Sequence, residues 1–338
     1  MVNSPAIESK VVHATTDDGL RLPVIDVTQS AFALLDDPQS VAALAEAFAE
    51  TERRNAWVPP LFMRFMLRRA AERSQLLRAV VEPQSDFLPG LTTYIMKLGA
   101  ENLPAGFDSD VDRRMAASPH LLAVRLRLQQ TAKLLAEGLE PLLAGRPAAP
   151  LVLVNIGGGP AIDSLNALIL LRRSQSALLQ RPIAIQVLDI DPAGPRFGAA
   201  ALAALSAQGQ PLAGLDITFT HEVYDWNKRS LLGDVVYRAS AQGAILAASS
   251  EGALFEYGSD DAIVANLATL HHGGRGAKLV VGSVTGNDPV RRRVIANSHF
   301  KLVPRGLDGF RPLAERGGFA IVRSLPTPLS DQVSLAPV

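Results

Sequence analysis

The sequence predicts an α/β protein built on a mostly parallel, doubly wound sheet and preceded by a helical N-terminal region. Three observations lead to this prediction. From about residue 150 onward, short apolar runs alternate with helix-like segments, a pattern typical of a parallel sheet covered by helices. A glycine-rich turn joins the first apolar run to the next helix. Residues 1–148 show helical periodicity, with little strand signal beyond a short piece near Val11–Ala14.

The N-terminal region is predicted to contain three main helices, each beginning at a proline. They start at Pro38, at Pro60 and at Pro119, and the second and third extend to about Val81 and Leu143. Two prolines between residues 147 and 150 then indicate a linker. We therefore expect a helical cap over residues 1–148, a sheet domain over 149–330 and a C-terminal tail over 331–338.

The sheet domain is predicted to contain five parallel strands followed by a closing pair. The parallel strands are expected at Leu151–Val154, Ile183–Asp189, Leu215–Thr220, Gly243–Ala248 and Lys278–Gly282. The closing pair, Phe300–Val303 and Gly318–Arg323, has too short a connection for a full crossover helix. We therefore expect one antiparallel strand at the edge of the sheet.

Composition restricts the class of protein. The 338 residues include 33 basic and 33 acidic side chains, so the formal net charge is zero, and 48% of the residues are hydrophobic. Because no cluster of Lys and Arg is long enough to follow a phosphate backbone, we expect no nucleic-acid partner. Cysteine is absent, which excludes disulfides and thiolate metal ligands. We predict no metal site.

The sequence predicts neither a signal peptide nor a membrane span. The N-terminus is polar, carries Glu8 and lacks the apolar segment of a secretion signal. The most apolar window, residues 151–171, contains Asn155, three glycines and Asp163, which disfavours insertion into a bilayer. We therefore expect a cytoplasmic protein with no membrane partner, and a homodimer stays open.

The turn after the first strand, Gly157-Gly158-Gly159-Pro160, indicates a ligand site. Glycines at a strand–helix turn allow the backbone to approach a ligand closely, and proline suits the first position of the following helix. A dinucleotide fingerprint would need glycine where Ile162 stands. A phosphate loop would need Gly-Lys-Ser/Thr after the turn, and this sequence lacks it.

The segment Asn155-Ile-Gly157-Gly158-Gly159 resembles the glycine motif of class I S-adenosylmethionine (SAM) dependent methyltransferases. The resemblance extends over about 180 residues of the second half of the chain. It implies a seven-stranded sheet with one reversed strand, and it implies SAM as methyl donor or as sole substrate. Asn155 stands where this family usually has an acidic residue.

The resemblance also implies roles for residues at the ends of the predicted strands. Asp189 matches the acid that accepts hydrogen bonds from both ribose hydroxyls, which a carboxylate does well. Asp225, with Tyr224 and Trp226 beside it, matches the region that holds adenine. The cofactor-binding residues implied in this way are Asn155, Gly157, Gly158, Gly159, Asp189, Tyr224, Asp225, Trp226 and Ser249.

Four further residues are candidates for the catalytic site: Tyr94, Ser250, Phe255 and Tyr257. Tyr94 lies in Leu88–Met96, where aromatic and hydroxyl groups follow a Pro-Gly break and could line the substrate pocket beneath a cap. Ser250 follows the fourth predicted strand, where the family shapes its reacting site. Phe255 and Tyr257 flank the same region.

These features favour a SAM-dependent enzyme of small-molecule, secondary metabolism that transfers a methyl group to a small metabolite. Some members of the superfamily instead cyclise SAM to azetidine-2-carboxylate and methylthioadenosine, or transfer its aminocarboxypropyl arm. The aromatics Phe87, Tyr94, Phe255 and Tyr257, together with Asn155, keep cyclisation open, because they could enclose the sulfonium and hold a neutral amine. An NAD-dependent oxidoreductase and a non-catalytic SAM-binding protein are the alternatives from other classes.

Overall fold

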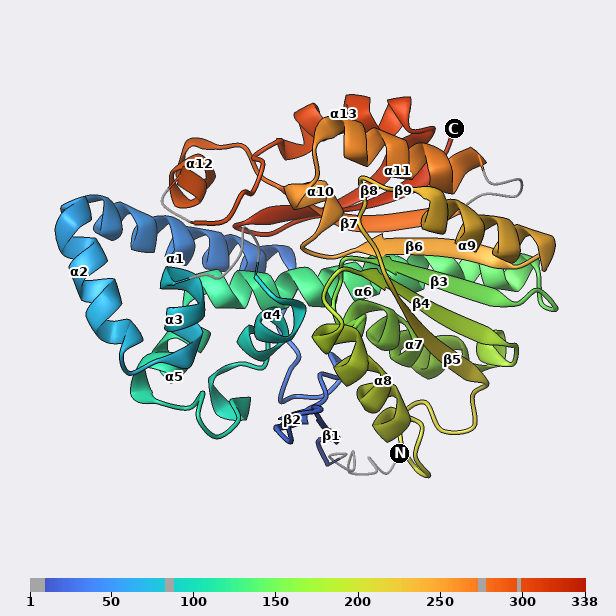
Figure 1. The fold of residues 1–338 in the computed structure, drawn as a ribbon, viewed down its shortest axis with the longest axis horizontal. Coiled ribbons are helices and arrows are strands. Elements are labelled where there is room, and N and C mark those ends of the chain that lie inside the picture. Colours follow the sequence, from blue (N-terminus) through green and yellow to red (C-terminus); the bar gives the residue numbers. More distant parts are fainter. Residues whose placement is uncertain (1–9, 83–87, 273–277, 297–298) are drawn as a thin grey trace.

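A seven-stranded sheet forms the centre of the protein in the computed structural model, which describes residues 10–82, 88–272, 278–296 and 299–338 (Figure 1). The strands are β3 (Leu151–Ile156), β4 (Ile183–Asp189), β5 (Ile217–Val223), β6 (Ile245–Ser250), β7 (Leu279–Thr285), β8 (Phe319–Pro326) and β9 (Ser330–Pro337). Their order is β5-β4-β3-β6-β7-β9-β8. The five strands from β3 to β7 pair in parallel, whereas β9 is antiparallel to both of its neighbours. This confirms the predicted doubly wound sheet with one reversed strand.

The end of the chain differs from the prediction in three ways. Residues 300–303 form no strand, and the closing pair consists of β8 and β9. Residues 331–337 belong to β9, so residues 331–338 are not a tail. The reversed strand also lies between β7 and β8 rather than at the edge of the sheet. The polar residues of β9 hid this strand from sequence analysis. One of them, Gln332, is buried, and its Nε2 donates a hydrogen bond to Gln130 Oε1 at 2.8 Å.

Helices cover both faces of the sheet and produce two hydrophobic cores (Figure 1). Side chains of β3 alternate between these cores, with Leu151 and Leu153 in one and Val152 and Val154 in the other, as expected for a strand buried on both faces. The first face is covered by α6 (Pro119–Gly145), α7 (Ile162–Gln175) and α8 (Ala193–Leu205), and the second by α9 (Ser230–Ala241), α11 (Asp260–His272) and α13 (Gly306–Arg316).

The N-terminal region is mainly helical, as predicted, but its second helix is interrupted. Its elements are β1 (His13–Thr15), β2 (Arg21–Pro23), α1 (Pro38–Ala56), α2 (Pro60–Ala71), α3 (Gln75–Val81), α4 (Gly90–Met96), η1 (Ala100–Asn102) and α5 (Asp110–Ala116). The break between α2 and α3 falls at Ser74, whose hydroxyl accepts a hydrogen bond from Leu77 N and donates one to Asp112 Oδ1. The remaining short elements are η2 (Ser176–Leu179), α10 (Leu254–Tyr257) and α12 (Pro289–Ala296).

The N-terminal region and the sheet share one core. Leu22, Tyr94 and Leu135 belong to the same cluster of buried side chains as Leu153 and Leu165. The long helix α6 lies along the sheet and packs against α7 (Figure 1). The division into a cap and a sheet domain near residue 148 thus stays a prediction, and the hydrophobic packing is continuous across it.

Candidate functional site

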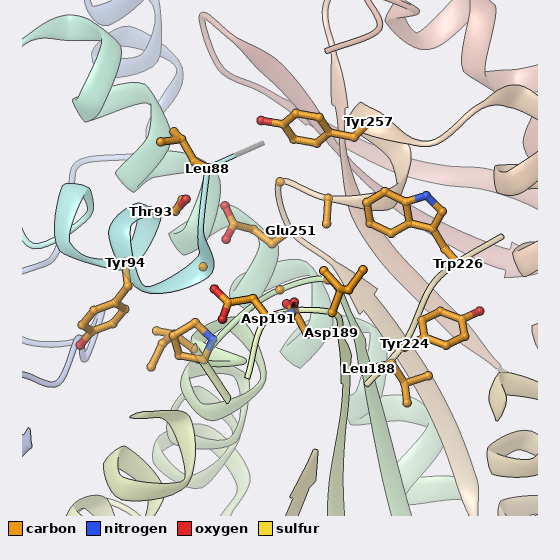
Figure 2. Close-up of a pocket in the computed structure, with 18 of the residues that line it drawn as sticks. Leu88, Thr93, Tyr94, Leu188, Asp189, Asp191, Tyr224, Trp226, Glu251 and Tyr257 are labelled. Atoms are coloured by element: carbon orange, nitrogen blue, oxygen red, sulfur yellow. Dashed lines mark hydrogen bonds between the residues drawn. The ribbon is translucent and has the colours of Figure 1, made fainter. Parts of the chain in front are cut away.

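A cavity of about 280 Å³ lies at the carboxyl ends of the parallel strands and is closed on one side by α4 (Figure 2). Strand β3 pairs with β4 on one side and with β6 on the other. Successive connections therefore lead away from β3 in opposite directions, which places the cavity at the topological switch point where ligands of such sheets bind. The lining comes from the glycine turn, the segments after β4, β5 and β6, and α4.

The glycine turn after β3 is held from beneath by Asn155. Its Oδ1 accepts a hydrogen bond from Gly158 N at 3.0 Å, and its Nδ2 donates to Asp163 Oδ1 at 2.8 Å and to Ser249 Oγ at 3.1 Å. Asn155 is fully buried and does not line the cavity, whereas Gly157 and Gly158 do. Asn155 and Ser249, both expected to contact a cofactor, are therefore placed to support the turn instead.

Three glycines from distant parts of the chain meet at this turn. Gly159 has a φ of +57°, and a Cβ on it would lie 2.9 Å from Gly90 Cα, at the start of α4. A Cβ on Gly194, in the first turn of α8, would lie 2.8 Å from Gly159 Cα. The turn, α4 and α8 thus approach one another at a distance that a side chain would prevent. Gly159 therefore serves this packing and does not itself line the cavity.

Asp189, at the end of β4, lines the cavity and is only 7% exposed. Its Oδ2 accepts a hydrogen bond from Gly159 N and its Oδ1 accepts one from Asp191 N, each at 2.9 Å. Burial raises the pKa of this carboxyl above its ordinary value. Because each carboxylate oxygen can accept about two hydrogen bonds, both oxygens retain capacity for a further donor.

The segment after β5 contributes Tyr224, Asp225 and Trp226 to the cavity wall. Tyr224 donates its hydroxyl hydrogen to Asn266 Oδ1 at 2.6 Å, so its polar group is already paired. Asp225 accepts hydrogen bonds from both nitrogens of Asn227. Figure 2 shows the indole of Trp226 at one side of the cavity, opposite α4.

Two of the four catalytic candidates, Tyr94 and Tyr257, line the cavity. The other two, Ser250 and Phe255, do not. Ser250 Oγ donates to Ile156 O at 3.0 Å and accepts from Leu254 N, whereas the ring of Phe255 packs on Phe310. These contacts correct the expectation that Ser250 and Phe255 form the reacting site.

Tyr94 contributes to the cavity wall but directs its hydroxyl elsewhere (Figure 2). That hydroxyl donates to Pro23 O at 2.5 Å and accepts a hydrogen bond from Ile25 N at 3.1 Å. The ring packs on Phe197, with the two centroids 4.8 Å apart. Tyr94 therefore joins α4 to the N-terminal segment, and its catalytic role stays a prediction.

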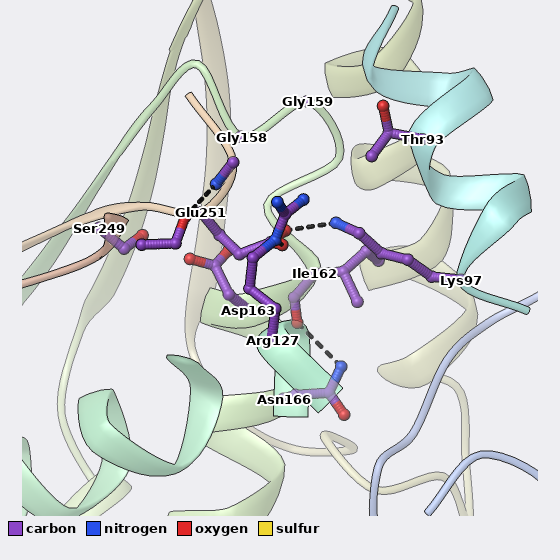
Figure 3. A network of polar contacts seen from close by, with 12 residues as sticks. Thr93, Lys97, Arg127, Gly158, Gly159, Ile162, Asp163, Asn166, Ser249 and Glu251 are labelled. Atoms are coloured by element: carbon purple, nitrogen blue, oxygen red, sulfur yellow. Dashed lines mark hydrogen bonds and ion pairs between the residues drawn. The ribbon is translucent and has the colours of Figure 1, made fainter. Parts of the chain in front are cut away.

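A buried ionic network at the cavity wall escaped sequence analysis (Figure 3). Lys97 and Glu251 form an ion pair, and both line the cavity. Arg127 Nε donates to Glu251 Oε1 at 2.5 Å, and Arg127 Nη1 lies 3.3 Å from Glu256 Oε2. Burial opposes ionisation of Glu251, but the attraction of Lys97 and Arg127 holds the pKa of its carboxyl below the ordinary value. Because 154 residues separate Lys97 from Glu251, no local pattern could have indicated the pair.

Comparisons with known proteins give a likeness of fold. No protein-family model and no curated protein matches the sequence. The structure of a possible exported protein from Bordetella parapertussis aligns with a TM-score of 0.55 and 16% identity, over 90% of this chain and 99% of that chain. That likeness extends through both the N-terminal region and the sheet. The chain has a methyltransferase-type fold: seven strands, one of them reversed.

Two other similar structures have lower TM-scores. LepI in complex with S-adenosylhomocysteine (SAH) and a substrate analogue aligns with a TM-score of 0.44 and 13% identity, over 89% of this chain and 95% of that chain. The N,N-8-amino-8-demethyl-D-riboflavin dimethyltransferase RosA from Streptomyces davawensis aligns with a TM-score of 0.36 and 14% identity, over 56% of this chain and 50% of that chain.

Within the described residues, His, Asp and Glu form no group of three or more that could hold a metal ion. In the same parts of the chain, no helix is both long and apolar enough to cross a bilayer.

Proposed function

We propose that this protein binds SAM and transfers its methyl group to a small metabolite. The observation that carries the proposal is the convergence of Gly157, Asp189 and Trp226 on one cavity at the switch point of the sheet. Together they offer a backbone that can be approached closely, a carboxylate for two hydroxyls and a flat apolar ring. These are the groups that an adenosyl ligand requires.

The cavity wall supports this fit. A Cβ on Gly157 would lie 2.8 Å from Ala253 Cβ and 3.2 Å from the Trp226 ring, so glycine keeps this part of the wall open. Asp189 would accept the ribose hydroxyls, since its two backbone hydrogen bonds orient the carboxylate without saturating it. Trp226 and Asp225 would border the adenine.

SAM supplies an activated methyl group when bound, so the protein's own tasks are alignment of the acceptor and exclusion of water. Thr93 of α4, with Leu88 before the helix and Lys97 after it, lines the wall opposite the strand ends and encloses the site. The cavity of about 280 Å³ lies just below the ~300–1,000 Å³ typical of small-molecule pockets. A small acceptor fits this space better than a macromolecule.

Cyclisation of SAM has less support from the side chains than methyl transfer. Of the aromatics that could enclose a sulfonium, Tyr94 and Phe255 direct their rings into packing with Phe197 and Phe310, and Phe87 lies outside the described residues. The amide of Asn155 is committed to the glycine turn. Tyr94 and Tyr257 both line the cavity, but the Tyr94 hydroxyl is bonded to Pro23 O and Ile25 N.

The first test is binding. Isothermal titration calorimetry of the full chain with SAM, SAH and NAD should give binding of SAM and SAH, and binding of NAD alone would contradict the proposal. Asp189→Ala should lower SAM affinity at least tenfold, equivalent to ~1.4 kcal/mol, because it removes the acceptor for both hydroxyls. The control is Asp234→Ala, which changes an exposed aspartate on α9 and should leave SAM affinity unchanged.

The second test identifies the carbon of SAM that reacts. The protein is incubated with SAM alone and with a panel of small hydroxyl and amine acceptors, and the products are read by mass spectrometry. Formation of SAH only when an acceptor is present supports methyl transfer. Release of methylthioadenosine from SAM alone, faster than without protein, would contradict methyl transfer and favour cyclisation.

A further inference from the structure

Lys97 and Glu251 form the part of the buried ionic network that lines the cavity. Lys97 follows α4 and Glu251 follows β6, so two distant parts of the chain supply the two charges. Their exposed fractions are 9% and 6%, and the remaining exposed surface faces the cavity that both residues line. Figure 3 shows the pair beside the glycine turn, with Glu251 lying between Gly158 and Lys97 in this view.

Glu251 is held in place independently of Lys97. Arg127 Nε binds Glu251 Oε1 at 2.5 Å, while Lys97 Nζ binds the other oxygen, Oε2. Gly252 allows the arginine to lie here, because a Cβ at that position would be 2.5 Å from Arg127 Nη2. If another cation replaced Lys97 at Oε2, Glu251 would keep its charge and its orientation through Arg127.

The position where the resemblance implies an acid does not supply a negative charge to the cavity. Asn155 stands there, and it is fully buried and bonded to Gly158, Asp163 and Ser249. Asp189 and Asp225 lie at the ends of β4 and β5, on the side where the adenosyl group is proposed to bind. Glu251 follows β6, on the other side of β3 from β4, and is therefore the cavity-lining carboxylate that lies away from the proposed adenosyl side.

We propose that Lys97 and Glu251 recognise the zwitterionic amino-acid arm of the ligand, with Glu251 binding the α-ammonium and Lys97 the α-carboxylate. This rests on the proposed function, because it assigns the arm of the SAM molecule whose adenosyl part is placed above. In the structure described here the two side chains neutralise each other. A bound zwitterion would break this internal ion pair and form two new ones, its ammonium with Glu251 and its carboxylate with Lys97. No buried charge is then left without a partner.

This assignment also bears on the reaction. An ammonium bound to the ionised carboxylate of Glu251 is kept protonated, and a protonated amine is not a nucleophile. The pair would therefore direct attack away from ring closure by the amine of SAM and leave the methyl group as the reacting carbon.

The test uses methylthioadenosine, which has the adenosyl part of SAM but not its amino-acid arm. Calorimetry with the full chain compares SAM and methylthioadenosine in wild type, Lys97→Met and Glu251→Gln. We expect each substitution to lower SAM affinity at least tenfold and to change methylthioadenosine affinity less than about threefold. Equal losses for both ligands, or no loss for SAM, would overturn the assignment while leaving the proposed function intact. Failure of wild type to bind either ligand would overturn both.

Matched controls separate recognition from general damage to the network. Lys133→Met removes a lysine that pairs with Asp36, and Glu256→Gln removes the second acidic partner of Arg127; neither residue lines the cavity. Both controls should keep the wild-type ratio of the two affinities. If a single substitution prevents folding, the double variant Lys97→Met, Glu251→Met is used instead. It removes both charges of the pair together, so neither is left buried without its partner. It should show the same selective loss of SAM, and an unchanged ratio would overturn the assignment.

Discussion

At the scale of single residues, Asp163 couples folding to pH. Its Oδ1 accepts a hydrogen bond from Asn155, while its Oδ2 has no partner among the described residues. Burial raises the pKa of Asp163 from 3.8 to about 6. Because the folded pKa lies above the unfolded one, the folded state binds the proton more tightly. The free energy of unfolding therefore falls as the pH rises through this interval, and the full penalty, on the order of 3 kcal/mol, applies above it.

Asp163→Asn should remove this dependence, because asparagine can still accept from Asn155 but carries no charge. We expect the variant to gain stability relative to wild type at about pH 7 and to gain little at about pH 4, measured by urea unfolding at both values. The exposed control Asp234→Asn should shift both values equally. A difference between Asp163→Asn and wild type that is the same at both pH values would show that the carboxyl titrates normally.

Sequence analysis identified those site residues whose role follows from their position in a single strand. Asp189 could be predicted because it ends an apolar run, and the carboxyl end of a parallel strand at the switch point is a ligand site. The hydrogen bond of the Tyr94 hydroxyl could not be predicted, because its acceptor is Pro23 O, 71 residues away in sequence. Lys97 and Glu251 were likewise invisible as a pair, since only the packing of α4 against the strand ends brings them together.

At the scale of elements, the connection between α6 and β3 is fixed by one arginine. Arg181 is 7% exposed, and its Nη1 donates to Arg146 O and Ala149 O at 3.0 Å, while its Nη2 donates to Leu143 O at 3.1 Å. These acceptors lie at the end of α6 and in the predicted linker. The segment is therefore hydrogen-bonded to the sheet region rather than free, and Arg181 satisfies carbonyls that the helix leaves unpaired.

Arg181→Met should lower the free energy of unfolding by about 1.5–3 kcal/mol, because several carbonyl groups lose a charged donor. Denaturant unfolding followed by circular dichroism measures the change. Arg173→Met, at an exposed position on α7, is the control and should change stability by no more than ~0.5 kcal/mol. Equal effects of the two substitutions would contradict a structural role for Arg181.

Elements were predictable where one periodicity dominates. β4 begins and ends at the predicted residues, Ile183 and Asp189, because a mainly apolar run, with Gln186 as the exception, specifies a largely buried strand. β9 was missed because its buried positions include Gln332, whose amide donates hydrogen bonds to the distant Gln130 and to Leu325 on β8. The break between α2 and α3 was missed because apolar residues continue on both sides of it.

At the scale of the whole molecule, the N-terminal region supplies part of the core beneath the sheet. α6 buries Leu128, Leu135 and Leu139 in the cluster that contains Leu153 of β3. Removing the first 148 residues would expose this apolar surface to water, at ~25 cal/mol for each Å² uncovered. The sheet region therefore needs α6 for its stability, although the sequence pattern alone suggests a separable cap.

A chain limited to residues 149–338 is accordingly expected not to fold cooperatively. Thermal unfolding by circular dichroism should show no sharp transition, and the truncated protein should bind a hydrophobic dye at room temperature. The full chain measured under the same conditions is the reference. A sharp transition in the truncated chain, or retained SAM binding, would show that residues 149–338 form an independent domain.

The overall topology followed from the sequence more readily than the site did. Alternating strands and helices limit the arrangement to a doubly wound sheet, since crossovers between parallel strands are right-handed. The contact of α4 with the glycine turn needs Gly90, Gly159 and Gly194 at one point. Glycines that are 69 and 35 positions from Gly159 give no joint signal in a single sequence.

The placement of the two tryptophans gives the molecule a built-in optical probe. Trp57, after α1, is 87% exposed, whereas Trp226 belongs to the cavity wall. A collisional quencher such as iodide reaches the exposed indole of Trp57 more readily than the partly buried indole of Trp226. Emission that survives quenching is therefore weighted toward the site, and a flat aromatic ligand that stacks beside Trp226 becomes visible without any label.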